Sequence, residues 1–493
     1  MKKLTKTLVI FSVMLVSIFL IGRVSSAKEV EINSTNFPDK ALREALTNLA
    51  EYGKSTIETD DVTGLYISSF DTAIADLTGL DLFTNLNELA LIGFKGTTIN
   101  LNNNKLKILE IYNTGGTTLK IEVPTLESLF IMASDPSVDK LSSIDISKCT
   151  KLSTLFVASN KIASVDLSKN VKLKVLSVVS SKITSLDLSN NTALDTLALN
   201  CSNLKAIDVT KLVNLVTLNL QSKKFTSIDV SKNTKLKNFS LDSSKSVKSV
   251  NVSKNTGLKN LSLTNIGINK VDISKNLNLT GFACYGSKIT SLNLTKHKNL
   301  KELNVSNTGV KSLNVTKNTK LSKLYVQNSK LKSLNLNKNK GLKYLNVSKT
   351  KITKINVTKL TKLLEFNAAN TGIKTLNLKK NKKLLALDVS NTKLKSLNLK
   401  ANKKLTDLSF YGSKIKKLDL KNFSYLNIHF KVKKGKSINL KPFLGTGYTG
   451  YVYEKGYVSY NKSKNTIKTK KKGSCSVGLS KGKKSYNIAI EIV

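Results

Sequence analysis

The chain has 493 residues and a formal net charge of +48, from 80 lysine and arginine residues against 32 acidic residues. Only Arg23 and Arg43 are arginines, so 78 of the basic residues are lysines. Because sequence-specific readers of nucleic acid depend on bidentate arginine contacts, this balance argues against a specific DNA or RNA partner. Four cysteines in a chain of this length do not make a disulfide framework, and we expect free thiols.

Residues 1–27 have the features of a signal peptide. Three lysines precede an apolar run from Leu8 to Gly22, and Ser25 and Ala27 are small residues that suit cleavage by signal peptidase. An uncleaved membrane anchor is the alternative, although a run of 15 residues is short for a membrane span. We therefore expect a secreted, extracellular protein with no transmembrane segment after cleavage.

Residues 28–80 are expected to form an N-terminal helical cap. In the segment FPDKALREALTNLA, residues 37–50, Pro38 and Asp39 suit a first helical turn, and the apolar residues that follow fall on one face. Such a helix would shield the open edge of the first repeat. The acidic run 58–61 lacks the glycine-centred alternation of a calcium loop, so no metal site is predicted.

Residues 81–428 are organised as a repeat with a period of 21 residues. Pairs of leucines at 86/89, 106/109 and 126/129 mark three looser units, and thirteen regular units follow. Every regular step is 21 residues except the 22-residue step from Leu236 to Leu258. A fixed period of this length indicates one solenoid, since each unit buries its apolar side only against its neighbours. The regular units begin at Leu152, Leu173, Leu194, Leu215, Leu236, Leu258, Leu279, Leu300, Leu321, Leu342, Leu363, Leu384 and Leu405.

Each repeat contains the pattern LxxLxLxxN twice, as in 152–160 and 162–170. The period-2 centre of each half predicts a short strand that pairs in parallel with the next repeat. We therefore expect two strands per repeat and a two-sheeted rod or arc that is straighter than a horseshoe. The asparagine that ends the second half recurs in a column, where its amide would satisfy buried backbone groups. The column comprises Asn170, Asn191, Asn233, Asn255, Asn276, Asn318, Asn339, Asn381 and Asn402, with Cys149, Leu212, His297, Leu360 and Phe423 as structural substitutes.

These residues resemble a bacterial leucine-rich repeat of the nested 21-residue class, LxxLxLxxNxLxxLDLxxNxx, as found in secreted internalin-like surface proteins. The chain departs from those proteins in its 21-residue rather than 22-residue period and in its lysine-rich loops. The resemblance implies a β-rich solenoid with parallel strands. It also implies a non-catalytic recognition or adhesion protein that binds a protein or glycan on a cell surface.

Residues 429–493 lose the repeat period and read as short alternating strands with glycine and lysine turns. This segment resembles a bacterial immunoglobulin-like domain of the second group, in which KKGKS would open the first strand and KTKKKGSCSV would lead into a late one. The resemblance implies a spacer or adhesion module.

No arrangement of residues in the sequence predicts an active site, a cofactor site or a metal site. His297 and His429 have no HExxH context or nucleophile nearby. A solvent-facing column is uniform, whereas acid–base catalysis needs two carboxyls in different environments. The column comprises Asp166, Asp187, Asp208, Asp229, Asp272 and Asp419, with Asn251, Asn293, Asn314, Asn335, Asn356, Asn377 and Asn398 at the other repeats. We expect no enzyme activity.

The outward column of the first strand is the candidate recognition face, because tyrosine and asparagine on a rigid sheet lose little side-chain entropy on binding. Ordinary solvent-facing strand residues are the alternative. The candidate binding residues are Phe156, Tyr285, Tyr325, Tyr344, Asn346, Asn367 and Tyr411.

The basic charge is uneven, with a net charge of −7 over residues 28–100 and about +51 over residues 101–493. Lysines in the repeat loops suit diffuse attraction to a polyanion, and solvated loop residues are the alternative. A second function therefore stays open: a wall-associated structural protein held by anionic wall polymers.

Overall fold

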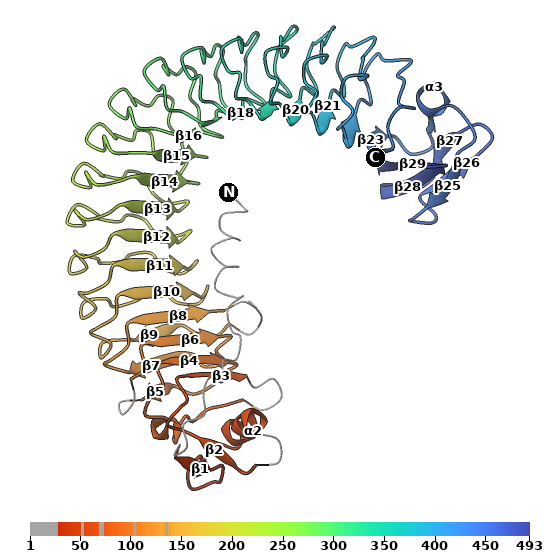
Figure 1. The fold of residues 1–493 in the computed structure, drawn as a ribbon. Helices are drawn as coiled ribbons and strands as arrows, with labels where there is room; N and C mark the ends of the chain where they lie inside the picture. The colour runs from red at the N-terminus through yellow and green to blue at the C-terminus, as the bar shows by residue number, and fades with distance from the viewer. Residues whose placement is uncertain (1–27, 51–53, 69–72, 102–104, 134–136, 138) are drawn as a thin grey trace.

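The computed structural model describes residues 28–50, 54–68, 73–101, 105–133, 137 and 139–493 (Figure 1). The predicted signal peptide, residues 1–27, lies outside these residues. The described chain winds as a solenoid that curves into an arc, with the repeat strands along its inner side (Figure 1). Within this part of the chain, no helix is both long and apolar enough to span a bilayer.

One long sheet lines the inner side of the arc. Equivalent residues of successive repeats pair in parallel, as Leu155 does with Leu176 and Leu176 with Leu197. The parallel strands predicted for the first half of each repeat are therefore confirmed. The regular strands are β10 (Thr154–Ala158), β11 (Val175–Val179), β12 (Thr196–Asn200), β13 (Thr217–Gln221), β14 (Asn238–Asp242), β15 (Asn260–Thr264), β16 (Gly281–Ala283), β17 (Glu302–Asn304), β18 (Lys323–Tyr325), β19 (Tyr344–Asn346), β20 (Glu365–Asn367), β21 (Ala386–Asp388) and β22 (Asp407–Ser409).

The sheet extends upstream through the looser repeats. Strand β3 pairs with β4, β4 with β6, β6 with β8 and β8 with β10, all in parallel. These strands are β3 (Gly64–Ser68), β4 (Glu88–Ile92), β6 (Ile108–Tyr112) and β8 (Ser128–Met132). The looser repeats are thus structural repeats of the same solenoid.

The asparagine ladder is present inside the solenoid. The Nδ2 atom of Asn339 donates to the carbonyls of Val315 at 3.0 Å and Asn318 at 2.9 Å, both in the preceding repeat. The nine asparagines of the column are all buried, and each donates in the same way. His297 substitutes for the amide with Nε2, which lies 3.1 Å from the carbonyl oxygen of Ile273. The predicted structural role of this column is confirmed.

The prediction of two strands per repeat is wrong for the regular repeats beyond β9, and so is the expectation of a straighter, two-sheeted rod. On the outer side of the arc, the described strands are β5 (Thr98–Asn100), β7 (Thr118–Glu122) and β9 (Ser143–Asp145), which pair only with each other. Further along, the outer half of each repeat forms turns, in which Asp166 Oδ1 accepts from the backbone N–H of Ser168 at 2.9 Å. Because these turns close within a repeat, the outer row is not held at the roughly 4.8 Å strand spacing of the inner sheet. The solenoid therefore curves around its inner sheet (Figure 1).

The predicted N-terminal helix is present as α2 (Lys40–Leu49). Asp39 caps it by accepting from the backbone N–H of Leu42 at 2.9 Å, and Leu42 and Leu46 are buried. The helix contacts β3 and β2 (Thr56–Glu58), and β2 pairs antiparallel with β1 (Glu29–Glu31). A short 3₁₀ helix, η1 (Leu80–Leu82), precedes β4. The role of α2 as a cap of the sheet edge stays a prediction.

The C-terminal segment is a β module that continues the inner sheet. Strand β23 (Tyr425–Val432) pairs in parallel with β22 and also with β29 (Lys484–Ile492), and β29, β28 (Gly473–Lys481) and β25 (Thr449–Val452) are antiparallel. A second antiparallel sheet contains β24 (Ser437–Asn439), β27 (Thr466–Thr469) and β26 (Val458–Asn461), and α3 (Lys441–Leu444) lies between β24 and β25 in sequence. The boundary predicted at 428/429 falls within β23, so it does not mark a break in the sheet.

Tyr486 of β29 joins this module to the last repeat. Its buried hydroxyl lies 3.0 Å from the carbonyl oxygens of Leu420 and Phe423, the two acceptors that an asparagine of the following repeat would otherwise use. The Tyr486 hydroxyl therefore takes the place of the next ladder asparagine. The immunoglobulin-like identity of the module stays a prediction.

Candidate recognition groove

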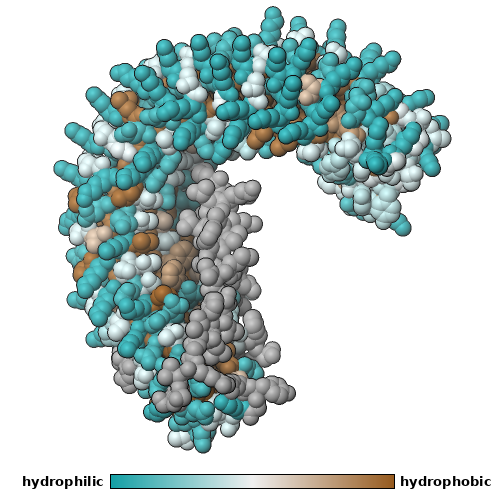
Figure 2. All heavy atoms as spheres, in the orientation of Figure 1, coloured by the Kyte–Doolittle hydropathy of each residue, from teal (hydrophilic) through white to brown (hydrophobic). Residues whose placement is uncertain are grey.

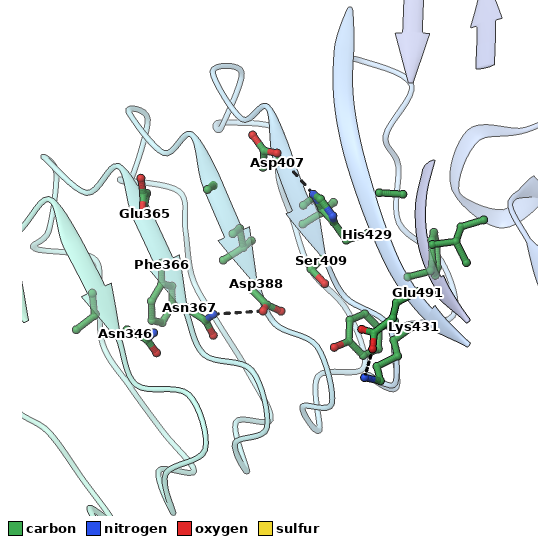
Figure 3. A pocket seen from close by; sticks show the side chains of 18 of the residues that line it. Asn346, Glu365, Phe366, Asn367, Asp388, Asp407, Ser409, His429, Lys431 and Glu491 are labelled. Carbon is green, nitrogen blue, oxygen red and sulfur yellow. Dashed lines mark hydrogen bonds and ion pairs between the residues drawn. The ribbon is translucent and has the colours of Figure 1, made fainter. Parts of the chain in front are cut away.

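A groove of about 620 Å³ lies on the inner face of the arc at its C-terminal end (Figure 3). It is formed where β18–β22 meet the long strands of the C-terminal module. We call this the inner groove. It is lined by Tyr325, Tyr344, Leu345, Asn346, Glu365, Phe366, Asn367, Ala386, Leu387, Asp388, Asp407, Leu408, Ser409, Tyr411, His429, Phe430, Lys431, Ser474, Cys475, Ala489, Ile490 and Glu491.

The floor of the groove follows from the alternation of the repeat strands. In each strand a buried leucine or phenylalanine, such as Leu324 or Phe366, points into the solenoid, so the next residue points out. Parallel pairing in register then aligns one outward residue per repeat into a column. This column runs through Tyr325, Asn346, Asn367, Asp388, Ser409 and His429.

The end wall of the groove comes from the C-terminal module. Strand β23 has eight residues and β22 has three, and Ser409 pairs with His429, so Phe430–Val432 run past the last repeat strand. The ring of Phe430 packs edge-on against Phe410 at 5.7 Å between centroids. Strand β29 pairs along all of β23 and brings Glu491 beside Lys431. Residues 60 positions apart in sequence thus meet at this wall.

Five of the seven predicted binding residues line the groove: Tyr325, Tyr344, Asn346, Asn367 and Tyr411. The structure does not bring the other two to it. Phe156 belongs to the same outward column but lies on β10, and Tyr285 lies just after β16. The groove thus gathers most, but not all, of the predicted residues on adjacent strands.

The asparagines of the groove also shape its backbone. Asn346 Oδ1 accepts from the N–H of Ser348 at 3.0 Å and from its hydroxyl at 2.7 Å. Asn367 Oδ1 accepts from the N–H of Ala369 at 2.9 Å, and its Nδ2 donates to Asp388 Oδ2 at 3.3 Å (Figure 3). These side chains are therefore held in place before any ligand binds, which lowers the entropic cost of binding.

Tyrosine and glutamate side chains supply the polar contacts that remain available. The hydroxyls of Tyr325 and Tyr344 and the carboxylate of Glu365 form no hydrogen bond with any other described residue in the structure. Burial raises the pKa of Tyr325 and of Tyr411, so both phenols stay protonated and can donate. Phenol faces beside amides and carboxylates can contact a sugar ring or a peptide chain.

Sequence reasoning missed the ionisable pairs of the groove, Asp407 with His429 and Lys431 with Glu491. Asp407 accepts from Asn427 Nδ2 at 3.2 Å and lies 3.6 Å from His429 Nε2 (Figure 3). Lys431 Nζ lies 2.5 Å from Glu491 Oε1, and this hydrogen bond raises the pKa of the lysine. No spacing in the sequence connects residues 431 and 491, because their contact depends on the β23–β29 pairing.

A composition signal could nevertheless have pointed to this face. Residues 301–493 contain 44 lysines and seven acidic residues. Five of those acidic residues, Glu302, Glu365, Asp388, Asp407 and Glu491, lie on strands of the inner sheet. Strands β10–β22 contain one lysine, Lys323, which pairs with Glu302 at 2.5 Å. The inner face is therefore neutral to acidic in a strongly basic protein, and hydrophilic side chains cover the outer rim of the arc (Figure 2).

Metal and thiol chemistry do not converge on the groove. Across the described ranges, no group of three or more histidine, cysteine or acidic side chains is placed to hold a metal ion. Cys475 lines the groove but is buried, as are Cys149, Cys201 and Cys284, and burial raises the pKa of all four thiols. The arrangement is suited to binding.

Comparisons with known proteins agree with this architecture. A family model described as the LRR domain of the endo-beta-N-acetylglucosaminidase EndoS matches residues 37–178. A search of curated proteins finds no match. Among solved structures, the functional domain of InlJ from Listeria monocytogenes is 22% identical, with a TM-score of 0.57, and the alignment covers 96% of this chain and 100% of that one. An LRR protein of Leptospira interrogans is 20% identical, with a TM-score of 0.54, over 72% of this chain and 86% of that one. The chain therefore has the fold of a leucine-rich-repeat solenoid.

Proposed function

We propose that this chain is an exported, non-catalytic recognition protein that binds a protein or glycan on a cell surface through the inner groove. The observation that carries the proposal is the separation of side chains by face. Tyrosines, asparagines and carboxylates gather on the rigid inner sheet, and lysines are almost excluded from it. If the lysines served only to solvate the protein, there would be no reason for them to be missing from the inner sheet. A specific contact surface on that sheet does give such a reason.

The other parts of the chain fit this role as supports. Helix α2 would cap the first repeat, and the C-terminal module, which resembles an immunoglobulin-like spacer, would present the arc and complete the groove wall. The predicted signal peptide supports export. The match of residues 37–178 to a repeat domain named for a glycan-cleaving enzyme gives glycans a place among the ligands to test.

The test is binding of the fluorescently labelled full chain to bacterial and mammalian cells, measured by flow cytometry. We expect Y325A/Y344A to lower the apparent affinity at least about tenfold, since tyrosines at the centre of an interface each contribute about 2 kcal/mol when they are hot spots. The matched control is F156A, an aromatic residue in the outward column of Tyr325 but outside the groove. Unchanged binding by the double variant, together with weaker binding by F156A, would place the site elsewhere.

The ligand class follows from pretreatment of the cells. Loss of binding after protease treatment identifies a protein, and loss after periodate oxidation identifies a glycan. The measurement is made at low salt and again at several hundred millimolar salt. Retention on anionic wall polymer, the second function considered, is electrostatic and disappears at high salt, where the Debye length is only a few ångströms. Binding through the groove persists.

A further inference from the structure

The lysines excluded from the inner sheet are concentrated in one set of outer segments. Each repeat returns from its outer side to the next inner strand through seven residues that begin at the aspartate or asparagine of the outer turn. We call these segments the return turns. The first six are 166–172, 187–193, 208–214, 229–235, 251–257 and 272–278, and the next six are 293–299, 314–320, 335–341, 356–362, 377–383 and 398–404.

The two sets differ sharply in charge. The first six return turns contain seven lysines and five aspartates, a net charge of +2, and the next six contain 15 lysines and no acidic residue, a net charge of +15. The difference arises partly because the turn residue is aspartate in five of the first six turns and asparagine in all of the next six. A net charge this dense over half of one surface attracts polyanions.

The change from aspartate to asparagine has no structural cause. Asp229 Oδ1 accepts from the backbone N–H of Ser231 at 2.8 Å, and Asn314 Oδ1 accepts from that of Thr316 at 3.0 Å. The same turn therefore forms with either residue. In the early repeats the carboxylate also feels a nearby ammonium: the pKa of Asp229 is lowered first by its backbone hydrogen bond and further by Lys232. The later repeats keep the lysine and lose its counter-charge.

The asparagine ladder holds these lysines in a row. Lys317, Lys338 and Lys380 are exposed, and each directly precedes a buried ladder asparagine. Asn339 donates to the carbonyl of Asn318 at 2.9 Å, so equivalent backbone positions are locked one repeat apart. One ammonium per repeat thus stands at intervals of roughly 5 Å or more, given the strand spacing on the inner side.

The outer surface is also hollowed beside this row. A hollow of about 420 Å³ is lined by residues that include Asn335, Asn337, Lys354, Asn356 and Thr375. Asn335 and Asn356 use Oδ1 in their own turns, accepting from the N–H two residues on at 3.1 and 3.0 Å. Their Nδ2 groups are left to donate outward. Amide donors between ammonium groups suit the non-bridging oxygens of a phosphodiester.

We infer that the six late return turns, 293–404, form a docking surface for a flexible linear polymer of polyol phosphodiesters. Single-stranded nucleic acid carries the same phosphodiester charge but is disfavoured, because these turns contain no exposed aromatic residue on which a base could stack and no arginine, His297 being buried. None of the residues of these turns lines the inner groove, so this surface binds independently of the proposed recognition function.

The test uses poly(glycerol phosphate) as the probe and biolayer interferometry with the full chain at 0.05–0.3 M salt. The test variant is K317Q/K338Q/K380Q, and the matched control is K169Q/K232Q/K275Q, since each of these six exposed lysines precedes a ladder asparagine. We expect the test variant to lose about 10- to 100-fold in affinity at 0.1 M salt and to lower the slope of log K against log salt by about 2. The control should change affinity less than about threefold.

A second variant separates charge from fold. N314D/N335D/N356D places in three late turns the carboxylate that the early turns already hold, so its thermal unfolding curve should match that of the wild type while its affinity for the probe falls. Equal losses in the test and control variants would overturn the inference, because the lysines would then act as a diffuse field. Equal or tighter binding of oligo-dT or heparin of matched charge would overturn the assignment of a polyol phosphodiester.

Discussion

The asparagine ladder predicts a specific energetic cost for each of its members, which Asn339→Ala tests most directly. Asn339 is fully buried and donates to the carbonyls of Val315 and Asn318 at 3.0 and 2.9 Å. Each carbonyl also accepts a backbone N–H, from Asn318 and Leu321 respectively, so neither is left without a partner. The variant therefore loses two hydrogen bonds at about 1 kcal/mol each, and about 1 kcal/mol more for the void. We expect the free energy of unfolding to fall by about 3 kcal/mol.

The assay is urea denaturation followed by circular dichroism, with hydrogen exchange to locate the effect. Asn339→Leu fills the void and should lower the free energy of unfolding by about 2 kcal/mol. A leucine fits there, because the next repeat has the buried Leu360 at the equivalent position of the ladder. Asn337→Ala is the control, since Asn337 is exposed two residues away and should change stability by less than about 0.5 kcal/mol. Faster exchange should be confined to the repeats on either side of residue 339, because a solenoid transmits strain mainly to its neighbours. Wild-type stability in Asn339→Ala would refute the role of the ladder amides.

Three further outcomes follow from the same contacts. Tyr486→Phe removes the hydroxyl that donates to the carbonyls of Leu420 and Phe423, and it should lower the free energy of unfolding in urea titrations by about 1–2 kcal/mol. An unchanged unfolding midpoint would contradict the proposed contribution of these hydrogen bonds between the module and the last repeat. Burial raises the pKa of the Cys284 thiol from 9.0 to about 12, so its contribution to stability is complete below the unfolded pKa and is lost as the pH rises toward 12. The stability difference between wild type and Cys284→Ala should therefore shrink between pH 8 and pH 11, and a constant difference would argue against a buried neutral thiol. Lys431→Gln breaks an exposed ion pair with Glu491 and should cost less than about 1 kcal/mol, so any larger loss in cell binding would report on the groove rather than on folding.

The features of the fold that could be predicted from the sequence are those repeated in every unit. The leucine spacing predicts parallel strands in register, and the column ending in Asn170 or Asn339 predicts a buried ladder, because one arrangement must satisfy all repeats at once. Curvature could not be predicted in this way. The two halves of a repeat share the LxxLxLxxN pattern, but the outer half has aspartate or asparagine at its turn position in every regular repeat. The inner half has such a residue only in some repeats, as at Asn304, Asn346 and Asp388. The local turn at Asp166 or Asn314 competes with strand pairing, and beyond β9 the turn prevails in the outer row.

The groove was only partly predictable because it depends on a feature outside the repeat. The column that holds Tyr325, Asn346 and Asn367 follows from the period alone, and Phe156 belongs to it equally. What distinguishes the C-terminal part of that column is the wall built by β23 and β29, whose parallel pairing joins segments 60 residues apart. The sequence does hold a second signal for the groove, which is the scarcity of lysine on the repeat strands. In residues 301–493, where lysines outnumber acidic residues by 44 to seven, the strands of the repeats hold one lysine, and it is paired with Glu302. Lysine is missing from the same strand positions in successive repeats. This pattern identifies the face on which a positive charge would interfere with binding, and the groove lies on that face.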